Sequence, residues 1–395
     1  MSAMSRMPVA SVVDERLRTT SICLGVAYGA RHDPENLGGL AHMLEHLLMA
    51  APVDGKGPLV EYIERLGGNA NAETGLEHML FHAQVDAADA DDVVRAMLTG
   101  ILRPELDSAV LDSERASVLQ ELAAAAADPA DVVQDAFLAA VFPGHPLGRP
   151  VGGAVDQIQA LDLEAVRAGH RDVFLASRIA VGIVGPSVPD SLLGWETRQP
   201  QAVHHRDPVP LNPVGAVAPA WPEEFGWAIV GGRSTPLDDP GRHRFTVLAA
   251  LLGGNASSPL YRKLRVDSGL AYSFQSWDRG YTEAGAWRVL IGVESGNGEK
   301  AVEIVTRELE DLAAAGPSDT DLDAARRQVR MSLITDAETP LEHARALALH
   351  AVGHTEPWDL EQELARIASV ESREIQQAAA QVLSGLITVV RPEPV

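Results

Sequence analysis

Three residues between Leu40 and Ala50 are spaced for metal chemistry. The stretch reads Leu-Ala-His-Met-Leu-Glu-His-Leu-Leu-Met-Ala and carries His42, Glu45 and His46. In a helix with about 100° per residue, the two imidazoles lie about 40° apart on one face, so they can hold one metal ion. Glu45 projects about 60° to the other side of His42, where its carboxylate would reach a water on the ion. The stretch can supply two ligands and a general base, although an ordinary amphipathic helix would show the same residues.

A zinc ion would need a third protein ligand and one open position for water. We expect a further helix, capped by Asp107 or Ser108, that carries Glu114 and Glu121. Seven residues apart in a helix, these carboxylates are only about 20° from alignment and face the same way. Glu121 follows His46 by 75 residues (121 minus 46) and is the candidate third ligand. An ordinary solvated acidic stripe is the alternative.

Other residues of ligand type are given no metal role. His78 and His82 fall on one face of an expected strand, but four residues of strand separate them by about 13 Å, too far to share one ion. Cys23 is the single cysteine, which excludes an internal disulfide. It lies in an apolar alternating run, where we expect a buried side chain rather than a nucleophile.

The composition is that of a globular protein with packed cores. The 395 residues are 46% hydrophobic and 22% charged, which suggests two or three domains. The net charge of -23 disfavours nucleic acid and anionic membranes as partners and would suit a basic or neutral peptide. The chain shows no signal-peptide pattern and no run of about 18 apolar residues, so we expect a cytoplasmic protein.

The elements that must position the candidate residues occur twice along the chain. Each half shows a strand, then a helix, then a mixture of strands and helices, and a Pro-rich stretch separates the halves. The predicted fold class is α+β, with two homologous α/β-sandwich-like domains, each a mostly antiparallel sheet covered by helices. The expected boundaries are a first domain at 1–195, a linker at 196–222 and a second domain of the same fold at 223–395.

The motif HxxEH, followed at this distance by a glutamate, resembles the pitrilysin family of zinc peptidases. That family includes insulin-degrading enzyme and mitochondrial processing peptidase. The resemblance implies one zinc ion per chain, held by His42, His46 and Glu121, with Glu45 as the base and Glu114 orienting a ligand. Further stretches that resemble the family are Gly29-Ala-Arg-His-Asp-Pro34, Asn71-Ala-Glu-Thr74, His145-Pro-Leu-Gly-Arg-Pro150, Gly253-Gly-Asn-Ala-Ser-Ser-Pro-Leu-Tyr-Arg-Lys-Leu-Arg265 and Gly269-Leu-Ala-Tyr272.

A pair of residues in the second half extends the resemblance to substrate binding. The family has an Arg and a Tyr seven residues apart that help to hold the substrate carbonyl, and Arg265 and Tyr272 match this pair. A guanidinium and a phenol are donors suited to a developing oxyanion. Taken alone, the same residues would be read as an exposed helix Arg and a core Tyr. By resemblance, the first domain is catalytic and the second binds substrate.

The family also binds its substrate as an extended chain against an edge strand. Here that strand would run from Glu77 to Val85 and include Phe81, with Asn71 and Thr74 nearby. Main-chain pairing makes such recognition tolerant of the peptide sequence.

The resemblance implies a zinc metalloendopeptidase that hydrolyses short or unfolded peptides, in general turnover or leader-peptide processing. We expect a homodimer whose two chains enclose a chamber. One alternative is the catalytic subunit of a heterodimer with a non-catalytic homologue. The other is a non-enzymatic scaffold, although such homologues usually lose zinc ligands and this chain keeps them.

Overall fold

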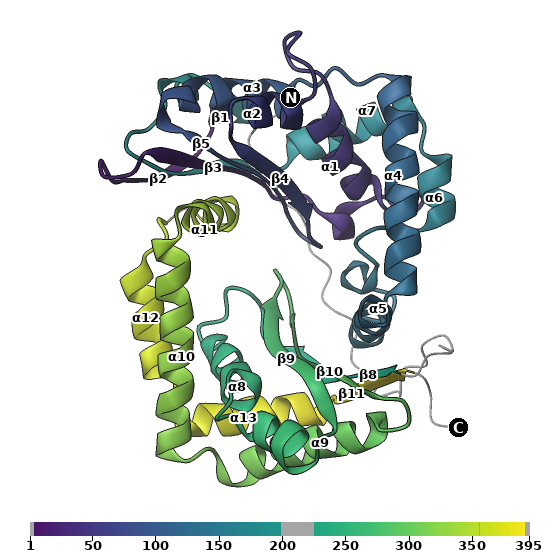
Figure 1. Ribbon diagram of the computed structural model, residues 1–395, viewed down its shortest axis with the longest axis vertical. Helices are drawn as coiled ribbons and strands as arrows, with labels where there is room; N and C mark the ends of the chain where they lie inside the picture. Colours follow the sequence, from purple (N-terminus) through teal and green to yellow (C-terminus); the bar gives the residue numbers. More distant parts are fainter. Residues whose placement is uncertain (1–3, 199–224, 355, 392–395) are drawn as a thin grey trace. The chain divides into compact units, whose positions relative to one another are not determined.

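A computed structural model describes residues 4–198, 225–354 and 356–391 (Figure 1). The expected linker at 196–222 therefore lies outside the described residues from 199 onward. The chain divides into two compact units that are not continuous in sequence. Unit 1 comprises Met1–Ala123, Pro150–Val203 and Thr335–Asp359, and unit 2 comprises Ala124–Arg149, His204–Ile334 and Leu360–Val395.

Unit 1 is built on a five-stranded sheet with the order β2-β6-β3-β5-β4. All neighbours pair antiparallel except β2 and β6, which are parallel. A separate short pair joins β1 (Met4–Arg6) to β7 (Glu196–Arg198). The strands of the sheet are β2 (Val9–Val13), β3 (Thr19–Val26), β4 (Asn69–Thr74), β5 (Met79–Asp86) and β6 (Ile179–Gly185).

The edge of this sheet differs from the expectation. The predicted edge strand from Glu77 to Val85 corresponds to β5, which is paired on both sides, by β3 and by β4. The edge strand is β4, where no strand was predicted, so the prediction of the edge is wrong. Its residues Asn-Ala-Asn-Ala-Glu-Thr offer only alanines to the interior, so the apolar alternation is weak. Polar residues are common on edge strands, where they discourage unwanted pairing.

Both faces of the unit 1 sheet are covered. Along β3, Ile22 and Leu24 belong to the large core, whereas the fully buried Cys23 belongs to a smaller cluster with α11 (Pro340–Gly353). Because alternate strand residues face opposite sides, α11 covers the face opposite the large core (Figure 1). The other helices of this unit are α1 (Leu40–Ala50), α2 (Leu59–Arg65), α3 (Ala90–Leu102), α4 (Ser108–Ala127), α6 (Val155–Ala160) and α7 (Leu163–Asp172).

Unit 2 is built on a four-stranded antiparallel sheet with the order β11-β8-β10-β9. Its strands are β8 (Phe225–Ser234), β9 (Ala271–Gly280), β10 (Gly285–Glu294) and β11 (Ile387–Arg391). Its helices are α5 (Pro129–Val141), α8 (His243–Gly253), α9 (Gly298–Ala315), α10 (Asp319–Glu338), α12 (Leu360–Ser369) and α13 (Ser372–Ser384), with a π-helical segment, η6, at Tyr261–Asp267.

Each unit contains one helix from the opposite half of the sequence. The helix α5 packs on β8 and β11, and Nε of Arg233 donates a hydrogen bond to the carbonyl of Val141 at 3.1 Å. In unit 1 the corresponding role belongs to α11. A sheet with two apolar faces needs helices on both. The sheet of unit 2 is therefore covered in part by α5 from the first half of the sequence, and the sheet of unit 1 by α11 from the second half. The predicted fold class, mostly antiparallel sheets covered by helices, is confirmed.

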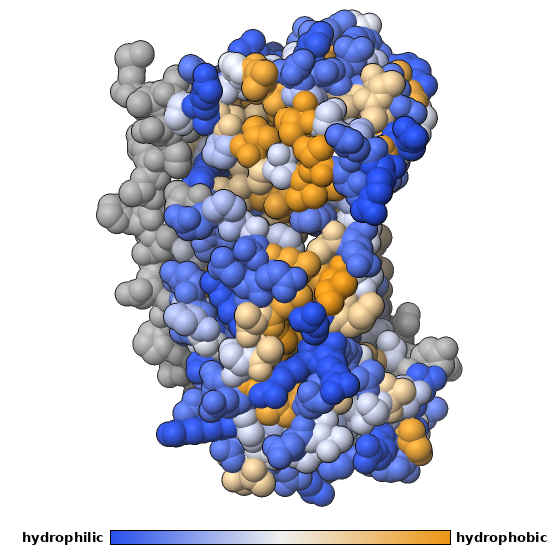
Figure 2. Space-filling view, turned by 90° about the vertical axis from the view of Figure 1, so that its left-hand side faces the viewer, coloured by the Kyte–Doolittle hydropathy of each residue, from blue (hydrophilic) through white to orange (hydrophobic). Residues whose placement is uncertain are grey.

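The face drawn in Figure 2 is mostly hydrophilic. Figure 2 shows that hydrophilic side chains cover most of the face in view, with hydrophobic side chains gathered in a few areas between them. Among the described residues, no helix is both long enough and apolar enough to cross a membrane.

Candidate active site

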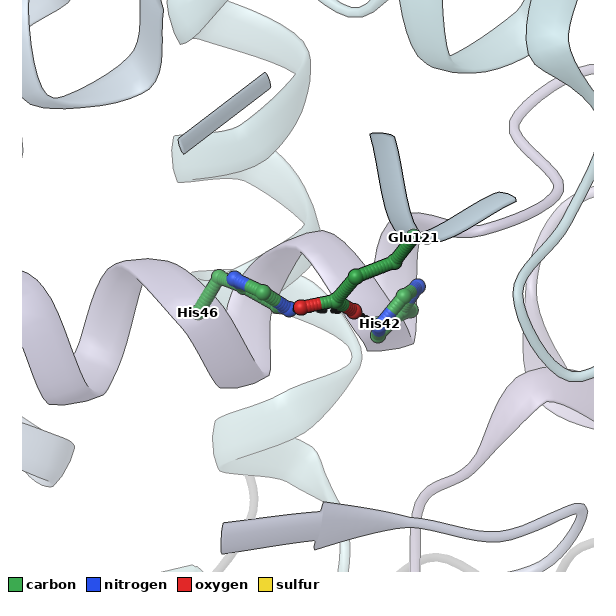
Figure 3. Close-up of side chains that lie close together, drawn as sticks. All are labelled: His42, His46 and Glu121. Atoms are coloured by element: carbon green, nitrogen blue, oxygen red, sulfur yellow. Dashed lines mark ion pairs between the residues drawn. The ribbon is translucent and has the colours of Figure 1, made fainter. Parts of the chain in front are cut away.

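Two helices of unit 1 bring the three predicted zinc ligands together. The rings of His42 and His46 lie one helical turn apart on α1, with centroids separated by 4.9 Å. Glu121 reaches them from α4, and its Oε2 lies 3.3 Å from Nε2 of His42 and 3.3 Å from Nε2 of His46. Figure 3 shows this carboxylate between the two rings. Among the described residues, this is the one group of three His, Cys, Asp or Glu side chains whose ligand atoms all lie within 4.8 Å of one another.

The donor set fits a zinc ion. Two imidazole nitrogens and one carboxylate oxygen are a common set of protein ligands in catalytic zinc sites. The side chains of His42 and His46 are each 15% exposed and that of Glu121 is 56% exposed, so the cluster opens to solvent where a water could bind. Burial and the neighbouring His46 lower the pKa of His42. The neutral imidazole, which is the form that binds a metal, is therefore favoured.

Glu114 lies behind one of the ligands. Its Oε2 is 3.2 Å from Nδ1 of His46, on the opposite side of the ring from Glu121. The two carboxylates of α4 face the same way, as the spacing of seven residues predicts, and both contact His46. A carboxylate on the second ring nitrogen fixes the ring orientation and directs Nε2 to the metal.

Glu45 is held by the edge strand. The hydroxyl of Thr74, the last residue of β4, donates a hydrogen bond of 2.5 Å to Oε2 of Glu45. Thr74 was predicted to lie near the substrate, but its hydrogen bond to Glu45 was not predicted. The two residues are 29 positions apart, and no local pattern indicates their pairing.

The other residues predicted to bind substrate differ in how accessible their side chains are to a peptide. Asn71 is exposed on the edge strand β4. Glu77 lies in the turn between β4 and β5, where its carboxylate pairs with the largely buried guanidinium of Arg31. Phe81 is fully buried and packs edge-on against Phe174, with ring centroids 6.2 Å apart. Its side chain cannot reach a substrate, and the prediction is wrong because β5 is internal and this residue faces the core.

The predicted pair for the substrate carbonyl belongs to unit 2. Arg265 is exposed on η6, and its guanidinium lies over the ring of Tyr261 at 5.4 Å from the centroid. Tyr272 is the second residue of β9.

Glycines determine how closely the chain packs at the start of α1. Gly39 and Gly153 have φ of +90° and +80°, a region that L side chains rarely adopt. A Cβ on Gly153 would lie 2.4 Å from the Cα of Gly39, so the two backbones are in direct contact. Gly39, directly before α1, thus serves both a tight turn and a close approach of two backbone segments. The adjacent carbonyl of Gly152 acts on His42 and raises its pKa, against the larger effect of burial.

Comparison with known proteins agrees with this site. Residues 8–155 match the sequence profile described as Insulinase (Peptidase family M16), and residues 160–329 match the profile described as Peptidase M16 inactive domain. All three candidate ligands fall in the first match.

Similar proteins cover nearly the whole chain. An uncharacterized zinc protease of Streptomyces coelicolor is 28% identical over 390 residues, which cover 93% of this chain and 83% of the relative. One of Mycobacterium tuberculosis strain H37Rv is 27% identical over 379 residues, covering 93% and 86%. The mitochondrial-processing peptidase subunit beta of Blastocladiella emersonii is 25% identical over 359 residues, covering 85% and 76%.

Solved structures show the same fold. A protease from Helicobacter pylori superposes with a TM-score of 0.88 at 17% identity, covering 100% of this chain and 99% of the other. A peptidase M16 inactive domain protein from Pseudomonas fluorescens gives 0.86 at 15% identity, covering 99% and 97%. The two profiles, the relatives and the fold confirm the predicted family: the chain belongs to peptidase family M16, a family of zinc proteases.

Proposed function

We propose that this chain is a zinc metalloendopeptidase that hydrolyses short or unfolded peptides. The observation that carries the proposal is the convergence of His42, His46 and Glu121 on one point, next to a glutamate of the same helix. Glu45 does not belong to the ligand group and is hydrogen-bonded by Thr74, so its carboxylate is available as a base.

Each residue of the cluster then has a distinct task. Nε2 of His42, Nε2 of His46 and the carboxylate of Glu121 hold the ion, and Glu114 keeps the ring of His46 in place. When bound, zinc supplies Lewis acidity for the attacking water and for the peptide carbonyl. Glu45 accepts the proton of the water and delivers it to the amine that leaves.

The edge strand supplies a place for the peptide. Within the described part of unit 1, β4 pairs with β5 on one side only, so its other edge has main-chain groups that can pair with an extended peptide. The strand ends at Thr74, whose hydroxyl touches Glu45. A peptide added along Asn71 to Thr74 would therefore approach the base, and its main chain, rather than its side chains, would supply most of the contacts.

The resemblance to the family supports a role for Arg265 and Tyr272 as donors to the substrate carbonyl. Arg265→Ala and Tyr272→Phe are expected to lower kcat while zinc content stays at the level of the unmodified chain. Loss of zinc in either variant would contradict this assignment.

Metal content and peptide cleavage test the function together. The purified chain is expected to carry about one zinc, and a chelator should abolish cleavage until zinc is restored. Glu45→Gln should keep the zinc and lose cleavage by about 100-fold to 10,000-fold, the usual effect of removing a general base. Glu121→Gln should lose the metal. Less than about half an equivalent of zinc, with no cleavage, would favour a scaffold.

We further propose that two copies of the chain form the peptidase and enclose the substrate. The support is that the zinc residues and the Arg265/Tyr272 pair all occur in this one sequence. Gel filtration with a peptidase assay tests this. An inactive chain that becomes active with a homologous partner would show the heterodimer instead, and mass spectrometry of products from a mixed peptide library would define the specificity.

A further inference from the structure

The helix that carries the zinc ligands has no capping side chain of its own. Its N-cap is Gly39, which has none to offer, and its first turn contains no acidic residue. The first backbone N–H groups of a helix have no partner within the helix and must find one elsewhere. His42 lies in this first turn, so its position depends on how these groups are held.

Asp33 provides the missing acceptor from outside the helix. Its Oδ2 accepts a hydrogen bond from the N–H of Gly39 at 2.8 Å, and its Oδ1 accepts one from the N–H of Ala41 at 3.0 Å. Asp33 is only 4% exposed. A carboxylate so deeply buried must be hydrogen-bonded to persist, and these bonds fix it to the start of α1.

The carboxylate is itself held from the sheet. The hydroxyl of Tyr28, two residues after β3, donates a hydrogen bond of 2.6 Å to Oδ1 of Asp33. Tyr28 is fully buried and packs edge-on against Phe174 at 6.3 Å between ring centroids. The link therefore runs from the core of the sheet, through a phenol and a carboxylate, to the first turn of α1.

A second tether acts on the same loop. Oε1 of Gln157, on α6, accepts a hydrogen bond from the N–H of Gly38 at 2.7 Å, and its Nε2 donates to the carbonyl of Glu35 at 3.2 Å. The segment between Asp33 and α1 is thus held from two sides.

The two histidine ligands differ in what holds them. His46 has a carboxylate on its second ring nitrogen, from Glu114. Nδ1 of His42 is buried and has no hydrogen bond of good geometry among the described residues, although the carbonyl of Gly152 lies close enough to act on the ring. His42 therefore depends on the backbone of the first turn for its position, and it does so more than His46.

We propose that Asp33, braced by Tyr28, is a positioning residue for the metal site. By fixing the first turn of α1 it holds His42 where the ion binds, so the ligands are organised before zinc arrives. The inference rests on the proposed function. If Asp33 were only a stabilising cap, its removal would lower the stability of the fold and leave zinc affinity unchanged. The proposal requires zinc affinity to fall as well.

The test measures the affinity of the chain for Zn²⁺ alone, by competition with a chromophoric chelator, alongside urea unfolding of the metal-free protein. Asp33→Ala should weaken zinc binding by about 10-fold to 100-fold, the range seen when groups that support a metal ligand are removed. Asp33→Asn keeps one acceptor oxygen and should recover part of the affinity. Tyr28→Phe removes only the brace, so its effect should have the same direction and be smaller.

Asp162→Ala is the matched control. Oδ1 of Asp162 accepts a hydrogen bond of 2.7 Å from the N–H of Ala165 at the start of α7, a helix of the same unit that carries no candidate ligand. This variant should lose a comparable amount of stability and keep its zinc affinity.

Two results would overturn the inference while the proposed function stands. One is zinc affinity in Asp33→Ala within about twofold of the unmodified chain, and the other is an equal loss of affinity in Asp162→Ala. If Asp33→Ala does not fold, Asp33→Asn and Tyr28→Phe decide in its place, and unchanged affinity in both would overturn it. An unmodified chain that binds no zinc would instead refute the proposed function and this inference with it.

Discussion

Replacement of Thr74 by Val tests whether the edge strand positions the base. Valine keeps the shape of the side chain and the backbone of β4, but it removes the hydroxyl that donates the 2.5 Å hydrogen bond to Glu45. A hydrogen bond to a charged group contributes about 1.5 to 3 kcal/mol. At about 1.4 kcal/mol for each factor of ten in rate, complete loss of this contribution would lower kcat by roughly 10-fold to 150-fold.

The assay is cleavage of a quenched fluorescent peptide at several concentrations, so that kcat and KM are separated. We expect kcat to fall and KM to change little, because the main-chain edge of β4 is kept. Zinc content should be unchanged, since Thr74 touches no ligand of the candidate site. Thr74→Ser, which keeps a hydroxyl, is the matched control. Near-normal kcat in Thr74→Val, or an equal loss in Thr74→Ser, would refute the reasoning.

Three further predictions concern the candidate zinc site, the start of α1 and the sheet of unit 2. Glu114→Gln should weaken zinc binding by about 10-fold to 100-fold in a chelator competition, because His46 loses its charged partner, and unchanged affinity would contradict this. Gly39→Ala should destabilise the fold more than Gly67→Ala in urea unfolding. Both glycines have positive φ, which costs a residue with a side chain about 1 to 2 kcal/mol. Only at Gly39 would the added Cβ also overlap neighbouring atoms, the nearest at 2.5 Å. Burial raises the pKa of Asp278 from 3.8 to about 6, above its unfolded value, so its contribution to stability is present below pH 3.8 and lost as the pH rises through 6. Asp278→Asn should remove this loss, about 3 kcal/mol at about 1.4 kcal/mol per pKa unit, and equal pH dependence in both proteins between about pH 3.5 and 7.5 would count against it.

The sequence predicted the parts of the site that depend on local geometry. A separation of four residues places His42 and His46 on one face of a helix wherever that helix lies, because the helical repeat is fixed by the backbone. The same argument aligned Glu114 with Glu121 over two turns of α4. The cap of α4 was also readable, because Asp107 does accept a hydrogen bond from the N–H of Val110 at the start of this helix.

Other features depended on residues that are distant in sequence. The edge strand was predicted at β5 instead of β4, because Asn69–Thr74 has too little apolar alternation to indicate a strand. Its pairing with β5 makes this segment a strand. The exchange of α5 and α11 between the units leaves no signal in periodicity, since an amphipathic helix is equally apolar whichever sheet it covers.

The sequence by itself determined which side chains can bind the metal and which can act as a base, since helix spacing and ligand chemistry are properties of a short segment. Only the tertiary structure decided what holds them. Thr74 on Glu45 and Asp33 at the first turn of α1 are hydrogen bonds from other elements, and they form only when the folded backbone brings those elements into contact.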